Sequence, residues 1–381
     1  MRPLPNIFSI FKQIAVNTDW ILFGSAILIS VGGLVTMNSF VGESSFAARQ
    51  ALWIIIASIF FFSLSAIDFR FLRRTSVITS MFIISCAVLS LLFALGQIVR
   101  GSQSWFDFGF FSFQPSDPVK LVLILLLAKY FTKRHIEIAH IRHIAVSGFY
   151  ALILFLLVIL QPDFGSAIII FLIWFGMVMV SGISKKHLLA VFLVGGLTFF
   201  LLWTFVFKDY QKQRIFTFIN PLADVRGAGY NAYQSTIAVG SGQLLGKGIG
   251  YGTQSKLSFL PEYQTDFIFA AFAEEWGFVG SLLLVLVFSI LIWRIISISS
   301  RGSSNFEILF GLGLSIYFMS HLVINFGMNV GLLPVTGITV PFMSYGGSHL
   351  LVEFAGLGII SGMARYSRPI TREMAKNEIV V

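Results

Sequence analysis

The chain has 381 residues, of which 56% are hydrophobic and 11% are charged. A soluble domain is about one-quarter charged, so this composition excludes an ordinary soluble protein and indicates a polytopic membrane protein. The formal net charge of +9 is found in nucleic-acid-binding proteins too, but the basic residues fall in loops between apolar segments, so we expect no nucleic-acid partner. The single cysteine, Cys86, excludes a disulfide within the chain and a cysteine-based metal site.

Ten apolar segments are long enough to cross about 30 Å of hydrocarbon. The sequence therefore predicts an all-α polytopic membrane protein of about ten transmembrane helices, forming a single membrane domain over residues 1–381. The eighth segment is longer than a span requires, so we expect it to be tilted or to project beyond the bilayer. The ten segments run approximately over residues 19–38, 48–67, 75–95, 117–133, 143–160, 164–182, 187–207, 267–294, 305–327 and 348–366.

Basic residues follow each even-numbered segment: the second, fourth, sixth, eighth and tenth. With ten spans, all the loops that carry them lie on one side of the membrane, which the positive-inside rule assigns to the cytoplasm. Both termini are then cytoplasmic, and loops 96–116, 208–266 and 328–347 face outward. The basic residues are Arg70, Arg73, Arg74, Lys133, Arg134, Arg142, Lys185, Lys186, Arg301, Arg365, Arg368, Arg372 and Lys376.

The outward loop 208–266 is far longer than an ordinary connection, and loops of this length usually have a function. Its basic residues run against the positive-inside trend and suit a phosphate-bearing ligand, although a general attraction to anionic lipid headgroups explains them equally well. These residues are Lys208, Lys212, Arg214, Arg226, Lys247 and Lys256.

The end of this loop, LPEYQTDFIFA, places Glu262, Thr265 and Asp266 at the mouth of the eighth span. A carboxylate in this position is costly unless it is solvated, paired or used. Thr265 or Asp266 could simply cap the helix, which would leave the carboxylate ionised and poorly basic. Because Asp266 closes a long basic loop and has no lysine near it in the sequence, we expect it to take part in chemistry.

Further into the eighth span, Glu274 and Glu275 follow within about two turns. We expect one of them to be protonated or to have an internal partner, such as Arg49 or Lys120.

Two further motifs place polar groups near the outward face. In FQPSDPVK, Asp117 and Lys120 are three residues apart and can pair on one helix face, either for function or as a structural ion pair. In QPDFGS, we expect Asp163 to cap the sixth helix. The histidines are scattered over different segments and show no metal-ligand spacing.

Together, these motifs resemble those of the SEDS family (shape, elongation, division and sporulation), and the similarity extends from the first span to Arg368. GTQS before LPE–TDFIFA, and LLPVTGI before PFMSYGG, are more similar to the RodA elongation branch than to the FtsW division branch. The resemblance implies a peptidoglycan glycosyltransferase that polymerises lipid II at the outer face of the bacterial cytoplasmic membrane during cell elongation. The motifs are FQPSDPVK, QPDFGSA, NPLAD, GYNAYQS, AVGSG, GKGIGYGTQSKLSFLPEYQTDFIFA, AEEWGFVG and GLLPVTGITVPFMSYGGS.

The resemblance also implies roles for individual residues. The family's catalytic aspartate falls on Asp266. Two positions depart from the family pattern: Asp117 stands where Glu is usual, and Ser104 stands where Arg is usual. The residues expected to bind substrate are Gln114, Ser116, Asp117 and Lys120 of the fourth-span motif, together with Arg49, Gln234, Ser235, Lys247, Glu262 and Thr265.

For this chemistry a base must take the proton of the acceptor sugar hydroxyl, and we assign that role to Asp266. The leaving lipid pyrophosphate needs no proton, but cations stabilise it, either Lys120, Arg49, Arg100 and the loop lysines or a divalent ion, Mg²⁺ or Mn²⁺, at a site that the sequence does not locate. The expected partners are lipid II, a class B penicillin-binding protein and other membrane proteins of the elongation complex. Two alternatives are a lipid II flippase, which the outward concentration of polar groups disfavours, and a non-catalytic scaffold for the penicillin-binding protein, which stays open.

Overall fold

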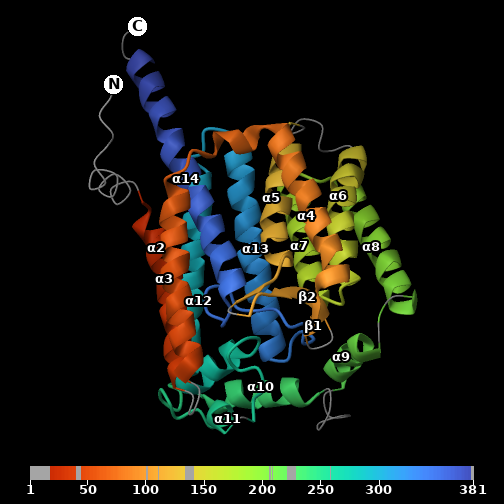
Figure 1. Ribbon diagram of the computed structural model, residues 1–381, viewed down its shortest axis with the longest axis vertical. Helices are drawn as coiled ribbons and strands as arrows, with labels where there is room; N and C mark the ends of the chain where they lie inside the picture. Colours follow the sequence, from red (N-terminus) through yellow and green to blue (C-terminus); the bar gives the residue numbers. More distant parts are fainter. Residues whose placement is uncertain are drawn as a thin grey trace.

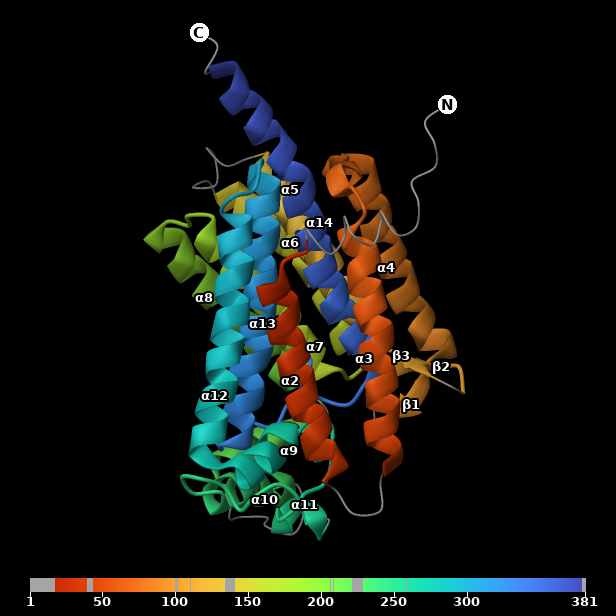
Figure 2. The ribbon, with the colours of Figure 1, turned by 90° about the vertical axis from the view of Figure 1, so that its left-hand side faces the viewer.

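The computed structural model describes residues 18–39, 44–99, 102–109, 111–133, 141–205, 207, 209–220, 229–257 and 259–378. Long helices stand side by side in a bundle, and three shorter helices lie across one end of it (Figure 1). The start of the first described helix and the end of the last lie toward the opposite end, as an even number of spans requires (Figures 1 and 2).

Ten long helices correspond to the ten predicted spans. Eight of them have the length and apolarity needed to cross a membrane, and α5 and α7 are shorter, with 17 residues each. The helices are α2 (Trp20–Asn38), α3 (Ser44–Ser65), α4 (Thr75–Leu95), α5 (Ser116–Thr132), α6 (Ile141–Ile159), α7 (Phe164–Val180), α8 (Lys185–Phe205), α12 (Ile268–Ser299), α13 (Asn305–Asn329) and α14 (Gly347–Glu378).

Helices α5 and α13 form the centre of the bundle. Helix α5 is buried on nearly every side, which is typical of an apolar helix without a polar face. Helix α13 packs against α5, α7 and α12, and its Phe310, Tyr317 and Phe318 are completely buried. Helix α8 lies at the edge, where Leu202 is its one buried residue (Figure 1).

Ion pairs join neighbouring helices toward the end of the bundle that carries the described termini. Arg294 of α12 binds the Asp19 carboxylate, which also caps α2, with a shortest N–O distance of 2.6 Å. A short 3-10 helix, η1 (Phe69–Arg73), follows α3, and its Arg73 pairs with Glu307 in the first turn of α13. Arg70, Arg73 and Arg74, which the sequence assigns to the cytoplasmic side, belong to the connection between α3 and α4 at this end.

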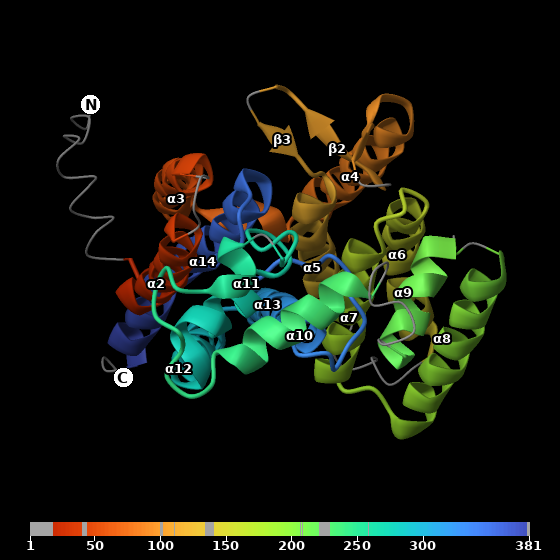
Figure 3. The same cartoon turned by 90° about the horizontal axis from the view of Figure 1, so that it is seen from below.

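The predicted outward loop 208–266 is largely folded. Its helices α9 (Asp209–Ile219), α10 (Tyr230–Ser241) and α11 (Thr253–Lys256) lie across the other end of the bundle (Figure 3). The predicted outward connection 96–116 forms a small antiparallel sheet in the order β1 (Gln97–Val99), β2 (Ser102–Asp107) and β3 (Ser112–Phe113), which the all-α expectation did not anticipate.

Helix α12 is broken at Gly277, whose φ of 68° and ψ of −166° are not helical. This region of backbone space is essentially restricted to glycine. The 32-residue α12 therefore consists of two helical parts that meet at Gly277, a break that the sequence did not predict. The outer loop fills the break through backbone hydrogen bonds from Lys247 N to Glu274 O (3.0 Å) and from Phe278 N to Gln243 O (2.9 Å).

Candidate active site

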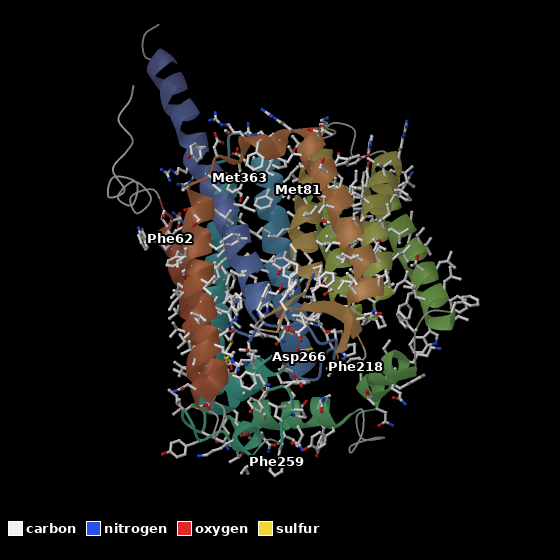
Figure 4. All side chains as sticks on the ribbon, viewed as in Figure 1. Phe62, Met81, Phe218, Phe259, Asp266 and Met363 are labelled. Atoms are coloured by element: carbon white, nitrogen blue, oxygen red, sulfur yellow. The ribbon has the colours of Figure 1, made fainter. Side chains whose placement is uncertain are left out.

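Asp266 lies in the turn that leads into α12, near the end of the bundle covered by the outer-loop helices (Figure 4). The N-cap residue of α12 is Phe267, the residue directly after Asp266. A Cβ atom placed on Gly337 would lie 3.6 Å from Asp266 Oδ2, so the carboxylate lies against the connection between α13 and α14. The side chain is partly exposed, as a group that must meet a substrate has to be.

The turn before Asp266 is stabilised by a hydrogen bond within the turn and by hydrogen bonds from the α13–α14 connection. Thr265 Oγ1 donates to Glu262 Oε2 at 3.0 Å, which joins two residues that the sequence assigned to substrate binding. Ser344 Oγ donates to the Thr265 carbonyl at 2.7 Å, and Tyr345 N donates to the Gln264 carbonyl at 2.8 Å. The α13–α14 connection therefore supports the backbone directly before the candidate base.

The predicted pair of Asp117 and Lys120 is confirmed, with Lys120 Nζ 3.1 Å from Asp117 Oδ1. Both side chains are buried, at 4% and 3% exposure. Ser348 Oγ donates to Asp117 Oδ2 at 3.3 Å and accepts from Gln114 N at 3.1 Å. The start of α5 and the start of α14 thus share one buried polar cluster.

Gln114 and Ser116 are engaged with the turn before α7. Gln114 Nε2 donates to Asp163 Oδ2 at 2.9 Å, and the Ser116 and Ser166 hydroxyls are 3.3 Å apart. Asp163 Oδ1 accepts from Ser166 N at 3.0 Å, which confirms Asp163 as the cap of the sixth span. Ser104, one of the two departures from the family pattern, is buried on β2.

Glu274 has a different partner from those expected. Lys247 Nζ lies 2.7 Å from Glu274 Oε1, so the expectation of an internal partner is confirmed for Glu274, although the partner is neither Arg49 nor Lys120. Glu274 also accepts from the backbone N–H groups of Thr253 (2.9 Å) and Gln254 (3.1 Å), because the loop folds back over the break in α12. Lys247 therefore anchors the loop in this structure.

The other predicted residues lie in different surroundings. Ser235 is completely buried and bonds Asn329, with Gln234 beside it on α10. Arg49 is on an exposed position of α3, next to Gln50, whose side chain bonds the Ser344 carbonyl.

Of the basic residues proposed for phosphate, Lys212 lies 5.9 Å from the centre of the Trp203 ring. Arg100, Lys208 and Arg226 lie outside the described residues, and the Arg214 side chain is not described.

Four buried polar residues of α13 and α14 were not predicted from the sequence as part of the site. In the described part of the chain, each has one buried side-chain atom without a hydrogen-bond partner, and each is within electrostatic reach of Asp117 or Lys120. Their spacing in the sequence does not connect them to the fourth-span motif, so the cluster can be recognised only in the folded structure. The residues are Tyr317, His321, His349 and Glu353.

No group of three or more His, Cys, Asp or Glu side chains that could hold a metal ion occurs among the residues described. Mg²⁺ is often held by only one or two carboxylates together with substrate phosphates. A metal at Asp266 would therefore have to take part of its coordination from a phosphate-bearing substrate.

The profile of the FtsW/RodA/SpoVE family, described as a cell cycle protein, matches residues 12–369. The chain belongs to this family. Its FtsW/RodA/SpoVE relatives include the peptidoglycan glycosyltransferase MrdB of Escherichia coli K12, 38% identical over 295 residues, which are 77% of this chain and 79% of MrdB. The stage V sporulation protein E of Bacillus subtilis is 36% identical over 324 residues, covering 85% of this chain and 88% of that protein.

Solved structures of the family have the same fold. A chain from a study of how a peptidoglycan synthase complex coordinates polymerization and crosslinking matches with a TM-score of 0.78 and 28% identity, over 92% of this chain and 98% of that one. The rod shape determining protein RodA of Thermus thermophilus matches with a TM-score of 0.69 and 26% identity, over 92% of this chain and 97% of that one. The bundle is therefore that of a multi-pass protein of the bacterial inner membrane.

Proposed function

We propose that this chain is a peptidoglycan glycosyltransferase that polymerises lipid II at the outer face of the cytoplasmic membrane, with Asp266 as the general base. The observation that carries the proposal is the position of Asp266, a partly exposed carboxylate at the loop-covered end of the bundle, lying against the α13–α14 connection. The peptidoglycan glycosyltransferase MrdB, to which the chain is similar over 77% of its length, supports the reaction class.

The reaction is a direct displacement at the anomeric carbon of the donor sugar. The acceptor hydroxyl oxygen forms the new bond to this carbon, its proton passes to the Asp266 carboxylate, and the bond to the lipid pyrophosphate breaks with the electron pair on the leaving oxygen. A positioned base contributes about 10²–10⁴-fold to such a step. The anomeric carbon is inverted, because attack and departure occur on opposite faces.

Negative charge on the leaving pyrophosphate needs cations. The candidates among the described residues are Lys120, Arg49 and the loop lysines Lys212, Lys247 and Lys256. A divalent ion, Mg²⁺ or Mn²⁺, would supply further charge stabilisation when bound. Because the Lys120 side chain is 3% exposed and paired with Asp117, it can reach a pyrophosphate only if the surrounding helices part. Gln114 and Ser116 would then contact substrate from the same helix start.

We expect a class B penicillin-binding protein and other elongation-complex membrane proteins as partners. The similarity to a chain solved in a peptidoglycan synthase complex supports this expectation, with 98% of that chain covered.

The test is glycan polymerisation by the purified protein with labelled lipid II, alone and with a class B penicillin-binding protein, in Mg²⁺, in Mn²⁺ and with a chelator. The wild-type protein should produce polymer. In Asp266→Ala and Asp266→Asn the rate of polymerisation should fall by at least about 10²-fold. Asp107→Asn, which alters an exposed carboxylate of β2, should remain active.

Full activity of folded Asp266→Ala would remove Asp266 as the base. If the wild-type protein forms no polymer with or without its partner, translocation of lipid II in vesicles would separate the flippase alternative from the scaffold alternative.

A further inference from the structure

Two asparagines of α13, Asn325 and Asn329, are completely buried one helical turn apart. Residues four apart lie on the same helix face. A buried amide is costly unless its donors and acceptor are used, so the contacts of these two side chains show what this face of α13 holds.

The donors of both amides converge on the backbone of the candidate base. Asn325 Nδ2 lies 2.9 Å from the Asp266 carbonyl oxygen, and Asn329 Nδ2 lies 3.2 Å from the same atom. Asn325 Nδ2 also donates to the Ile338 carbonyl at 2.6 Å. Since Gly337, the residue before Ile338, lies beside the Asp266 carboxylate, Asn325 holds the backbone on both sides of that carboxylate.

The side-chain oxygen of Asn329, Oδ1, binds the start of α12. Ala270 N donates to Asn329 Oδ1 at 3.2 Å. Ala270 is in the first turn of α12, where N–H groups have no partner within the helix. The Ser235 hydroxyl of α10 donates to the same oxygen at 3.1 Å. One side chain of α13 therefore joins α10, the start of α12 and the Asp266 peptide.

We propose that Asn325 and Asn329 are positioning residues that fix the Asp266 carboxylate for catalysis by holding its peptide against α13. The proposal rests on the proposed role of Asp266 as the base. Neither asparagine needs to touch substrate, because both act through the Asp266 carbonyl. A shift of about 1 Å in a reacting group can cost about 10²-fold in rate, so loss of either bond should lower kcat.

The experiment compares Asn325→Ala and Asn329→Ala with Ser315→Ala, at equal amounts of folded protein. Ser315 is a matched control, since it is a buried polar residue of α13 whose hydroxyl donates to the Gly311 carbonyl of its own helix. For each asparagine variant, kcat of lipid II polymerisation should fall roughly 10- to 100-fold, while KM for lipid II changes by less than about twofold, as expected for a residue remote from substrate. Ser315→Ala should retain both constants.

A double-variant cycle then shows whether Asn325 acts through the base. Asp266→Glu reaches about one bond further, so the loss from Asn325→Ala should be smaller in the Asp266→Glu background than in the wild type. Equal losses in the two backgrounds would overturn the positioning role. If Asn325→Ala does not fold, Asn325→Leu, which keeps the volume without a buried polar group, is measured in the same cycle.

The failures are distinguishable. Inactive Asp266→Ala with unchanged kcat in both asparagine variants would overturn the positioning role and leave the proposed function intact. Active Asp266→Ala would overturn the base assignment and the positioning role together. A rise in KM at constant kcat would show that the asparagines serve substrate binding, which also contradicts the proposal.

Discussion

Two side chains of opposite charge, Asp117 and Lys120, lie one helical turn apart in the centre of the bundle. In such surroundings, removing one partner leaves a buried charge, which typically costs about 3–5 kcal/mol. Ser348 is the second donor to Asp117, and a neutral hydroxyl does not replace an ammonium group. The pair therefore affects both stability and any use of Lys120 for substrate.

Lys120→Ala should reduce the free energy of unfolding and polymerisation much more than Lys256→Ala. Lys256 is exposed, and its Nζ contacts only the Gly250 carbonyl at 3.4 Å among the contacts described, so a surface interaction of roughly 0–1 kcal/mol is at stake. Thermal unfolding in detergent and lipid II turnover at equal folded protein measure the two effects. Equal values for the two variants would make the α5 cluster peripheral.

A double variant separates folding from substrate binding at this pair. Asp117→Asn with Lys120→Met removes both charges and should recover folding without recovering activity if Lys120 also serves the substrate. Recovery of both would show that the pair is structural.

Gly337→Ala should lower activity through the backbone beside Asp266. Gly337 has a φ of 77°, a left-handed conformation that costs a residue with a Cβ atom about 1–2 kcal/mol. The added methyl group itself would meet Asp266 Oδ2 at an ordinary contact distance of 3.6 Å. Polymerisation kinetics measure the effect, and Gly182→Ala, at a φ of 94° with open space around it, is the control for strain alone.

Helix α12 and the outer loop form one structural element, because the loop backbone completes the hydrogen bonding at the break. A Cβ atom on Gly277 would overlap the backbone of Gly246, and one on Gly246 would overlap the Glu275 carbonyl. The two glycines therefore allow the backbones to approach, and the ion pair of Lys247 with Glu274 closes the contact.

Gly277→Ala should detach the loop from α12 and abolish polymerisation, since it combines a conformation strained by about 1–3 kcal/mol with a backbone overlap. Limited proteolysis of the outer loop should become faster. Gly195→Ala is a suitable control, because it lies in α8 with open space around it. Unchanged protease resistance in Gly277→Ala would show that the loop is held independently of the break.

The helices were predictable from sequence because long apolar runs in a membrane protein must form complete helices. The pair of Asp117 and Lys120 was predictable for the same local reason, a spacing of three on one helix. The partner of Glu274 was not, since Lys247 lies 27 residues away in a loop whose path depends on glycine geometry. Asn325 likewise finds its partner, the Asp266 carbonyl, 59 residues away. Glu353 accepts from Phe342 N in the α13–α14 connection, whose path the sequence does not predict.

At the scale of the whole molecule, the bundle has two unlike ends. The described termini and η1 are toward one end, and α9, α10 and α11 cover the other (Figures 1 and 2). This arrangement agrees with the distribution of basic residues, which assigns the end that carries the termini to the cytoplasm.

Single-cysteine labelling in a Cys86→Ser background should therefore modify Leu245→Cys from outside intact cells and leave Lys185→Cys unmodified. Leu245 is 81% exposed in the outer loop. Lys185 is exposed as well, at the start of α8, so accessibility differs only through the membrane. Labelling of Lys185→Cys by a membrane-impermeant reagent would show that the orientation is the opposite of the predicted one.

The position of α8 at the edge of the bundle has a consequence for the choice of lipid. Only 6% of the residues in its most apolar stretch are buried against protein, whereas the corresponding share for residues Gly347–Tyr366 of α14 is 78%. A helix of 21 residues is about 32 Å long, so acyl chains, and not neighbouring helices, form most of its surroundings. The tilt of α8 should consequently follow the thickness of the bilayer. When the purified protein is placed in lipids of different acyl-chain length, α8 should be the helix that changes its tilt most.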